Sequence, residues 1–239
     1  FFRYMVGQLG QLERKSIEPI ALAVEDGRVR AMQRFVSEAV WDDDRILTKY
    51  RSLVNEDLGD ENGVLIFDES GFVKKGEDSI GVSKQYCGNV GKVENCQVGV
   101  FAAYASPHGY ALVDKRLYIP EKWFGDAYSD RRRKCELPEE VQFRSKPQLA
   151  AEMFNTLCTE GQIPFRYVLA DSIYGENPDF IEAVEQRTGV SYFVSVQADT
   201  LCWLTTPITC EKTYRYKGKI KKKTVLHPAE KKPISVASI

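Results

Sequence analysis

Two short apolar runs, far apart in the chain, each lead directly into an aspartate. Val64–Phe67 precedes Asp68, and Tyr167–Ala170 precedes Asp171. A continuous apolar run of this length is typical of a strand that is buried on both faces of a sheet, with a polar residue where the strand ends. We therefore expect a sheet that is covered by helices and carries both aspartates at its edge.

The first part of the chain is expected to be helical. Apolar residues recur at helical spacing over residues 20–24 and again over 32–40. An aspartate among residues 42–44 can cap a further helix that runs through Val54. A segment bounded by Gly59 and Gly63 then breaks the pattern. We predict a helical N-terminal unit over residues 1–62, with a DNA-binding or accessory role.

The middle of the chain alternates strands with helices. A tight turn at residues 106–109 joins two predicted strands into an antiparallel hairpin, and strand–helix–strand connections follow it. The predicted elements are strands 97–105, 110–119, 167–170 and 192–196 and helices 149–157 and 180–185. This order predicts an α/β fold over residues 63–200, a mixed sheet flanked by helices with the layout of ribonuclease-H-like folds.

Charge is distributed unevenly along the chain. The whole sequence has 33 basic and 34 acidic side chains, but nine basic residues and only two acidic ones follow Cys210. A basic segment beside an acidic body suits contact with a polyanion, and a solvated lysine-rich hairpin is the alternative. Threonine, tyrosine and alternating lysine predict a β-rich region over residues 201–239. The basic residues of this tail are Lys212, Arg215, Lys217, Lys219, Lys221, Lys222, Lys223, Lys231 and Lys232.

The two aspartates have a specific chemical consequence. Two carboxylates at the ends of buried strands are desolvated and repel each other if they lie close together, so a counter-charge is needed. Magnesium prefers hard oxygen ligands, and a pair of such ions can activate a water and stabilise a leaving oxygen in phosphoryl transfer. The alternative is that each aspartate only caps the turn that follows its strand. We expect Asp68 and Asp171 to be metal ligands.

Three longer segments carry a family resemblance. Residues 67–76 (FDESGFVKKG), 91–106 (with GKVENCQVGV and AYAS) and 169–175 (LADSIYG) are similar to the catalytic segments and central hairpin of DDE-superfamily transposases of bacterial insertion sequences, the 701-type group. The resemblance implies that Asp68 and Asp171 are the first two carboxylates of an Asp-Asp-Glu triad. They would bind two Mg²⁺ or Mn²⁺ ions for DNA hydrolysis and strand transfer.

The third carboxylate of the triad departs from this pattern. In the family it is a glutamate on a helix beyond a β-rich insertion, and we find no such segment before Ile239. Glu211 and Glu230 lie in the lysine-rich tail and not in an amphipathic helix. We therefore expect the triad to be incomplete, residues 201–239 to be the start of the insertion, and the chain by itself to be inactive.

The resemblance also implies the partners. Double-stranded DNA, both element ends and target, is the expected partner, bound by a homodimer in the prokaryotic cytoplasm, at the nucleoid, and no membrane is involved. Several side chains are candidates for DNA contact, with Tyr174 stacking on or positioning an end nucleotide. These candidates are Lys74, Lys75, Tyr174, Lys217, Lys219, Lys221, Lys222 and Lys223.

Two other functions are compatible with parts of the sequence. One is a catalytically dead DNA-binding remnant, which would use the helical unit and the basic tail. The other is an aspartyl-nucleophile phosphatase of the haloacid dehalogenase type, because an apolar strand ending at Asp68 is followed later by Asp171. That chemistry needs a second aspartate two residues after the nucleophile, and Ser70 stands there instead.

Overall fold

The computed structural model describes residues 1–40, 42–230 and 232–239, so Lys231 of the basic tail lies outside the described residues. These residues form two compact units, Phe1–Thr48 and Lys49–Ile239. The boundary falls earlier than the predicted residue 62. The reason is that helix α4, Asp43–Leu58, continues into the second unit, where its residues Arg51 and Val54 are buried.

The first unit contains three short helices, α1 (Phe2–Leu9), α2 (Ile17–Ala23) and α3 (Val29–Ser37), before the start of α4. Its small core consists of Ile20, Ala21 and Met32. Asp42 accepts a hydrogen bond from the backbone N–H of Arg45 at 3.0 Å, as predicted for an aspartate that caps the helix running through Val54.

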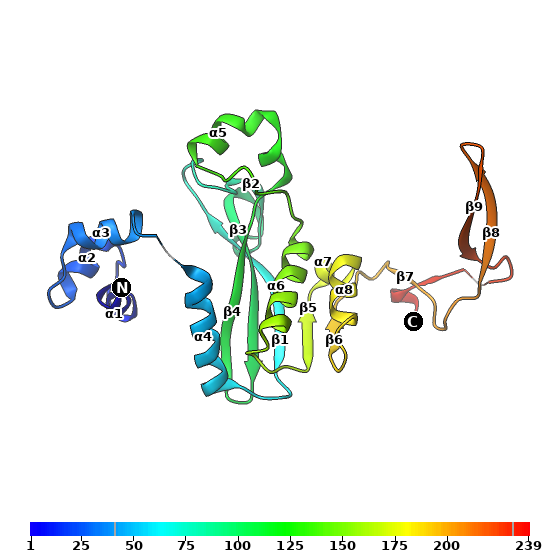
Figure 1. Cartoon of the computed structure of the whole chain (residues 1–239), viewed down its shortest axis with the longest axis horizontal. Helices are drawn as coiled ribbons and strands as arrows, with labels where there is room; N and C mark the ends of the chain where they lie inside the picture. The colour runs from blue at the N-terminus through cyan, green and yellow to red at the C-terminus, as the bar shows by residue number, and fades with distance from the viewer. Residues whose placement is uncertain (41, 231) are drawn as a thin grey trace. The chain divides into compact units, whose positions relative to one another are not determined.

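The second unit is built on a six-stranded mixed sheet (Figure 1). Strands run in the order β2-β3-β1-β5-β6, and β4 pairs with β3. The pairs β1–β3, β2–β3 and β3–β4 are antiparallel, whereas β1–β5 and β5–β6 are parallel. The predicted mixed sheet is thereby confirmed. The strands are β1 (Val64–Val73), β2 (Ser83–Cys87), β3 (Lys92–Ser106), β4 (Gly109–Tyr118), β5 (Tyr167–Ala170) and β6 (Ser191–Val194).

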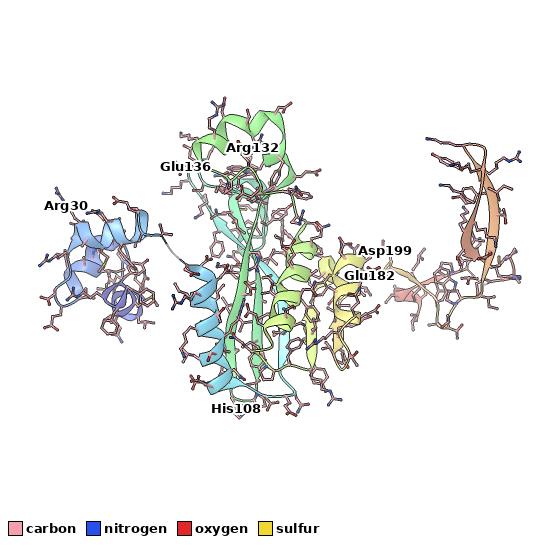
Figure 2. The ribbon with its side chains drawn as sticks, viewed as in Figure 1. Arg30, His108, Arg132, Glu136, Glu182 and Asp199 are labelled. Carbon is pink, nitrogen blue, oxygen red and sulfur yellow. The ribbon has the colours of Figure 1, made fainter. Side chains whose placement is uncertain are left out.

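The predicted turn between two strands is present, and His108 marks it at the end of the β3–β4 hairpin (Figure 2). Several elements were not predicted: β2, the five additional residues at the start of β3, and short helices in polar connections. These short helices are α5 (Ser129–Lys134), α7 (Ser172–Gly175) and 3-10 turns at Gly88–Val90, Glu121–Phe124, Asp126–Tyr128 and Val236–Ser238.

Helices α6 (Lys146–Glu160) and α8 (Pro178–Glu185) pack on one face of the sheet. The start of α6 is set by a capping box between Ser145 and Gln148, and its end by Gly161 in the left-handed conformation. Phe67 of β1 contacts one aromatic ring from each helix, Phe154 at 6.4 Å and Phe180 at 5.3 Å between ring centroids. This face therefore holds the hydrophobic core.

The opposite face of the sheet is exposed. A row of side chains crosses it from β4 to β6, through Leu112, Ala103, Ile66, Leu169 and Phe193, in the observed pairing register. Leu169 is 37% exposed and Phe193 is 66% exposed. The prediction that the two apolar runs are buried on both faces is therefore wrong, because among the described residues the helices of this unit pack on the other side.

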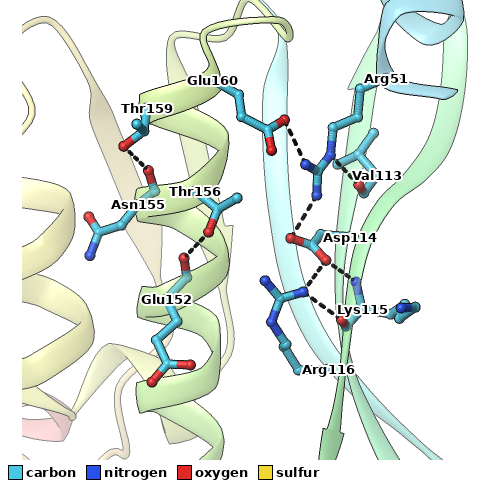
Figure 3. A network of polar contacts seen from close by, with 10 residues as sticks. All are labelled: Arg51, Val113, Asp114, Lys115, Arg116, Glu152, Asn155, Thr156, Thr159 and Glu160. Atoms are coloured by element: carbon cyan, nitrogen blue, oxygen red, sulfur yellow. Dashed lines mark hydrogen bonds and ion pairs between the residues drawn. The ribbon is translucent and has the colours of Figure 1, made fainter. Parts of the chain in front are cut away.

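A buried arginine joins α4 to the sheet and to α6 (Figure 3). Arg51 Nε donates to the Val113 carbonyl oxygen at 2.9 Å, while its terminal nitrogens contact Asp114 at 2.8 Å and Glu160 at 2.7 Å. Asp114 is fully buried and also contacts Arg116. Because α4, β4 and α6 all contribute to this network, it fixes their arrangement around the core.

Beyond the sheet, the chain forms two small antiparallel pairs. β7 (Leu201–Cys202) pairs with β10 (Ile234–Ser235), and β8 (Thr209–Tyr216) pairs with β9 (Lys219–Leu226). Lys217 and Gly218 make the β8–β9 turn with positive φ at both positions, as a type I′ hairpin turn requires. The strands lie where the sequence predicts a β-rich region. No helix among the described residues is long and apolar enough to cross a membrane.

Candidate metal centre

The parallel pairing of β1 with β5 brings Asp68 and Asp171 together. The last paired residues are Phe67 and Ala170, so the two aspartates are the next residues on neighbouring strands. Parallel neighbours present the same end of each strand at the same edge. The structure thereby juxtaposes two residues that are distant in the chain, as the two apolar runs predicted.

Asp68 does not end its strand, which is a correction to the prediction. β1 continues to Val73 because its other edge stays paired with β3 as far as Val73 and Cys96. Asp68 instead lies where β1 loses β5 as a neighbour on one side. Its Oδ1 accepts a hydrogen bond from the backbone N–H of Glu69 at 2.8 Å.

Asp171 begins the one-turn helix α7. Its Oδ1 accepts a hydrogen bond from the backbone N–H of Ile173 at 3.0 Å, so it has the capping role that was the alternative interpretation. Burial raises the pKa of Asp171, and the carboxylates of Glu69 and then Asp68 raise it further. The part of this pKa shift that comes from Glu69 and Asp68 is repulsion among carboxylates, which a bound cation would relieve.

Glu69 is a third carboxylate that sequence reasoning missed. One oxygen from each of Asp68, Glu69 and Asp171 lies within 4.8 Å of the others. The two aspartates accept bonds from nearby backbone N–H groups, whereas Glu69 accepts from two distant side chains, Lys146 Nζ and the Tyr174 hydroxyl, both at 2.7 Å. Its place directly after Asp68 was visible in the sequence, but these distant partners were not.

The donor set suits a hard divalent cation. Carboxylate oxygens are preferred ligands of Mg²⁺ and Mn²⁺, and Asp68 and Asp171 are both exposed to solvent at the edge of the sheet. A shallow cleft beside them has an apolar floor. It is lined by Ile66, Phe67, Asp68, Leu169, Ala170, Asp171, Phe193, Val194 and Ser195. The two aspartates therefore fit the predicted metal, with open space for a further ligand.

Tyr174 does not lie where a nucleotide could stack on it. Its side chain is fully buried and its ring packs against Phe180 at 5.8 Å between centroids. The structure thus contradicts the predicted stacking contact. The physical reason is that α7 turns the ring inward, toward the core, where its hydroxyl meets Glu69.

Lys74 and Lys75 lie past the far end of β1. Lys75 is exposed and Lys74 is partly buried. Lys74 is six positions along the chain from Asp68, which corresponds to roughly 20 Å of extended strand. These lysines are therefore too far away to contact the same phosphate group as the aspartates.

The lysines of the β8–β9 hairpin are divided between its two faces, and side chains project from both faces in Figure 2. Tyr214 is opposite Lys221 and Tyr216 is opposite Lys219, so these four side chains share one face. Lys222 belongs to the other face and forms an ion pair with Glu211 at 2.9 Å. Sequence position alone did not separate these lysines.

Comparison with known proteins points to the same family as the sequence resemblance. A family model described as DDE superfamily endonuclease matches residues 2–238. The curated protein "Probable transposase for insertion sequence element IS701" of Microchaete diplosiphon is 29% identical over 204 residues. The alignment covers 83% of this chain and 49% of that protein, so the chain spans about half the length of the curated relative it matches.

Proposed function

Since this chain belongs to the DDE superfamily of endonucleases, we propose that it provides the first two metal-binding carboxylates for cleavage and transfer of DNA strands at the ends of an insertion sequence. The observation that carries this proposal is the convergence of Asp68 and Asp171 at the end of the β1–β5 pairing. The mixed sheet is consistent with the ribonuclease-H-like fold of such enzymes.

Asp68 and Asp171 are the residues that would hold Mg²⁺ or Mn²⁺, two ions by family resemblance. When bound, such ions activate a water or a hydroxyl for attack on a phosphodiester and neutralise charge on the leaving oxygen. The protein's own contribution is positional. β1 holds the backbone of Asp68, β5 ends directly before Asp171, and the backbone N–H groups of Glu69 and Ile173 orient the two carboxylates. The exposed cleft beside them leaves room for a DNA strand.

A duplex-binding experiment tests metal and DNA together. We expect Mn²⁺ to strengthen binding of a fluorescent DNA duplex to this chain, relative to binding in a chelator, because a cation held by carboxylates keeps positions for phosphate oxygens. Asp171→Asn should remove the Mn²⁺-dependent part and leave binding in the chelator unchanged. Fluorescence anisotropy measures both. Equal Mn²⁺ enhancement in the variant would support the DNA-binding remnant and contradict our proposal.

We also propose that one face of the β8–β9 hairpin contacts the phosphate backbone. This face, which we call the basic–aromatic face, presents lysines interleaved with two tyrosines and no acidic residue. It consists of Lys212, Tyr214, Tyr216, Lys219, Lys221 and Lys223. Lys221 lies 5.2 Å from the Tyr216 ring centroid and Lys223 lies 5.4 Å from that of Tyr214, so the rings hold the ammonium groups in a row. Phosphate groups are the partner that such a row suits.

Two adjacent lysines provide a matched test of this face. Lys221→Gln is expected to weaken duplex binding at low salt and to reduce the slope of log affinity against log salt by about 0.9, the value for one phosphate contact. Lys222→Gln, which changes the same charge on the opposite face, should leave the slope unchanged because Glu211 already pairs with Lys222. Equal effects of the two substitutions would contradict the assignment, and no effect of either would favour a solvated hairpin.

A further inference from the structure

A largely buried hydrogen-bonded group of three side chains lies beside the aspartate pair. Glu69 on β1 accepts from Lys146 at the start of α6 through Oε1, and from the Tyr174 hydroxyl on α7 through Oε2, both at 2.7 Å. Tyr174 is fully buried, and the side chains of Glu69 and Lys146 are 17% and 21% exposed. Three elements that are remote in the chain therefore meet at one carboxylate.

The direction of the Glu69–Tyr174 bond is fixed. Burial, and then the hydrogen bond to Glu69, raise the pKa of Tyr174 far above its ordinary value, so the phenol stays protonated and donates. Lys146 balances the charge of Glu69. A carboxylate with a partner on each oxygen is held in one orientation, since turning it would break a bond in a partly buried position.

This bond ties the helical turn that begins at Asp171 to β1. α7 is a single turn of helix, with Asp171 at its start and Tyr174 inside it. The carbonyl oxygen of Asp171 accepts from the Gly175 N–H at 2.8 Å, and its side chain accepts from Ile173, so Asp171 moves with α7. The β1–β5 pairing ends at Phe67 and Ala170, just before the site. Beyond that point the Tyr174–Glu69 bond links α7 back to β1, the strand of Asp68.

We propose that Tyr174 and Glu69 are positioning residues, which hold the carboxylate of Asp171 at its distance from that of Asp68 and so set the divalent-cation affinity of the pair. This inference rests on the proposed metal site. It differs from a role of Glu69 as a third ligand, because it assigns the Glu69 oxygens to Lys146 and Tyr174 and not to the cation. It also assigns the buried Tyr174 hydroxyl a role in addition to packing.

The test is Mn²⁺ binding by Tyr174→Phe, which removes one hydroxyl and changes no charge. We expect the Mn²⁺ affinity to fall about tenfold, the effect typical of losing a group that orients a metal ligand. Tyr192→Phe is the matched control. The Tyr192 hydroxyl also donates to a glutamate, Glu185, at 2.7 Å, but neither residue is part of the Glu69–Tyr174 group. The control should bind Mn²⁺ as the unchanged chain does. Free Mn²⁺ is measured by electron paramagnetic resonance on samples that circular dichroism shows to be folded.

The outcomes separate this inference from the proposed function. Unchanged or tighter Mn²⁺ binding by Tyr174→Phe overturns the positioning role. Such a result would mean that loss of the Tyr174–Glu69 bond either has no effect on the metal site or frees a Glu69 oxygen to bind the cation. If the unchanged chain binds Mn²⁺ no better than Asp68→Asn does, the metal site itself fails, whatever Tyr174→Phe shows.

Glu69→Gln is the second variant, and it decides the question if Tyr174→Phe does not fold. Glutamine keeps the length of the side chain, can accept from Lys146 through Oε1 and can donate to the Tyr174 oxygen through Nε2. A positioning role predicts Mn²⁺ affinity closer to that of the unchanged chain than to that of Asp68→Asn. Loss of affinity equal to that of Asp68→Asn would make Glu69 a ligand and overturn the inference.

Discussion

Asp68→Asn is expected to lower the Mn²⁺ affinity of this chain by about tenfold or more, because it removes a charged oxygen donor from a pair whose mutual repulsion the cation relieves. The substitution preserves size and leaves an oxygen that can accept the Glu69 N–H bond. β1 should therefore stay paired with β3, and the fold should be retained. In a form of the protein that cleaves DNA, metal-dependent cleavage should disappear with the same change, while binding to element ends remains.

The control for this experiment is Asp199→Asn, at an exposed aspartate that is labelled in Figure 2. It removes the same formal charge without touching the aspartate pair. Isothermal titration calorimetry with MnCl₂ measures the difference in Mn²⁺ affinity between the two variants. If the two variants bind Mn²⁺ equally well, Asp68 is not a ligand, and the account of this protein as a metal-dependent enzyme loses its main support.

Arg51→Met is expected to reduce the free energy of unfolding by about 3–5 kcal/mol, the cost typical of removing one partner from a buried ion pair. Methionine matches much of the length and apolar volume of the arginine stem. The loss therefore falls mainly on Asp114, which is fully buried and would keep Arg116 as its charged partner among the described residues. Glu160 and the Val113 carbonyl would lose a donor as well.

Urea unfolding, followed by circular dichroism, measures the effect of Arg51→Met. Arg144→Met is the comparison, because Arg144 pairs with Glu152 at 2.9 Å with both side chains about half exposed. An exposed pair of this kind contributes less than about 1 kcal/mol. Equal destabilisation by the two substitutions would mean that the Arg51 network does not fix α4 and α6 around the sheet.

The pairing of the two apolar runs was predictable from the sequence, and so was the approach of their aspartates. Continuous apolar runs identify strands, and residues that follow two parallel neighbouring strands meet at one end of the pair, although β2, β3 and β4 lie between β1 and β5 in the chain. The end of β1 was not predictable in the same way. Residues 69–71 read as polar and flexible, yet the antiparallel ladder with β3 keeps them extended as far as Val73.

The supporting residues of the site were beyond reach of local patterns. Glu69 is separated from Lys146 by 77 positions and from Tyr174 by 105, and each hydrogen bond depends on how α6 and α7 pack on the sheet. Tyr174 shows the same limit, because a tyrosine near an acidic motif suits DNA contact as well as burial. Only the inward turn of α7 decides between the two.

The uneven support of the two strands gives the site one rigid side and one adaptable side. Asp68 belongs to a strand that is paired with β3 along all 10 of its residues, whereas Asp171 starts a helix of four residues. Amide hydrogen exchange should accordingly be slow at the backbone of Asp68 and faster at Ile173 and Tyr174. Any adjustment of the carboxylates to ions of different radius would then occur on the Asp171 side, with β1 as the fixed reference.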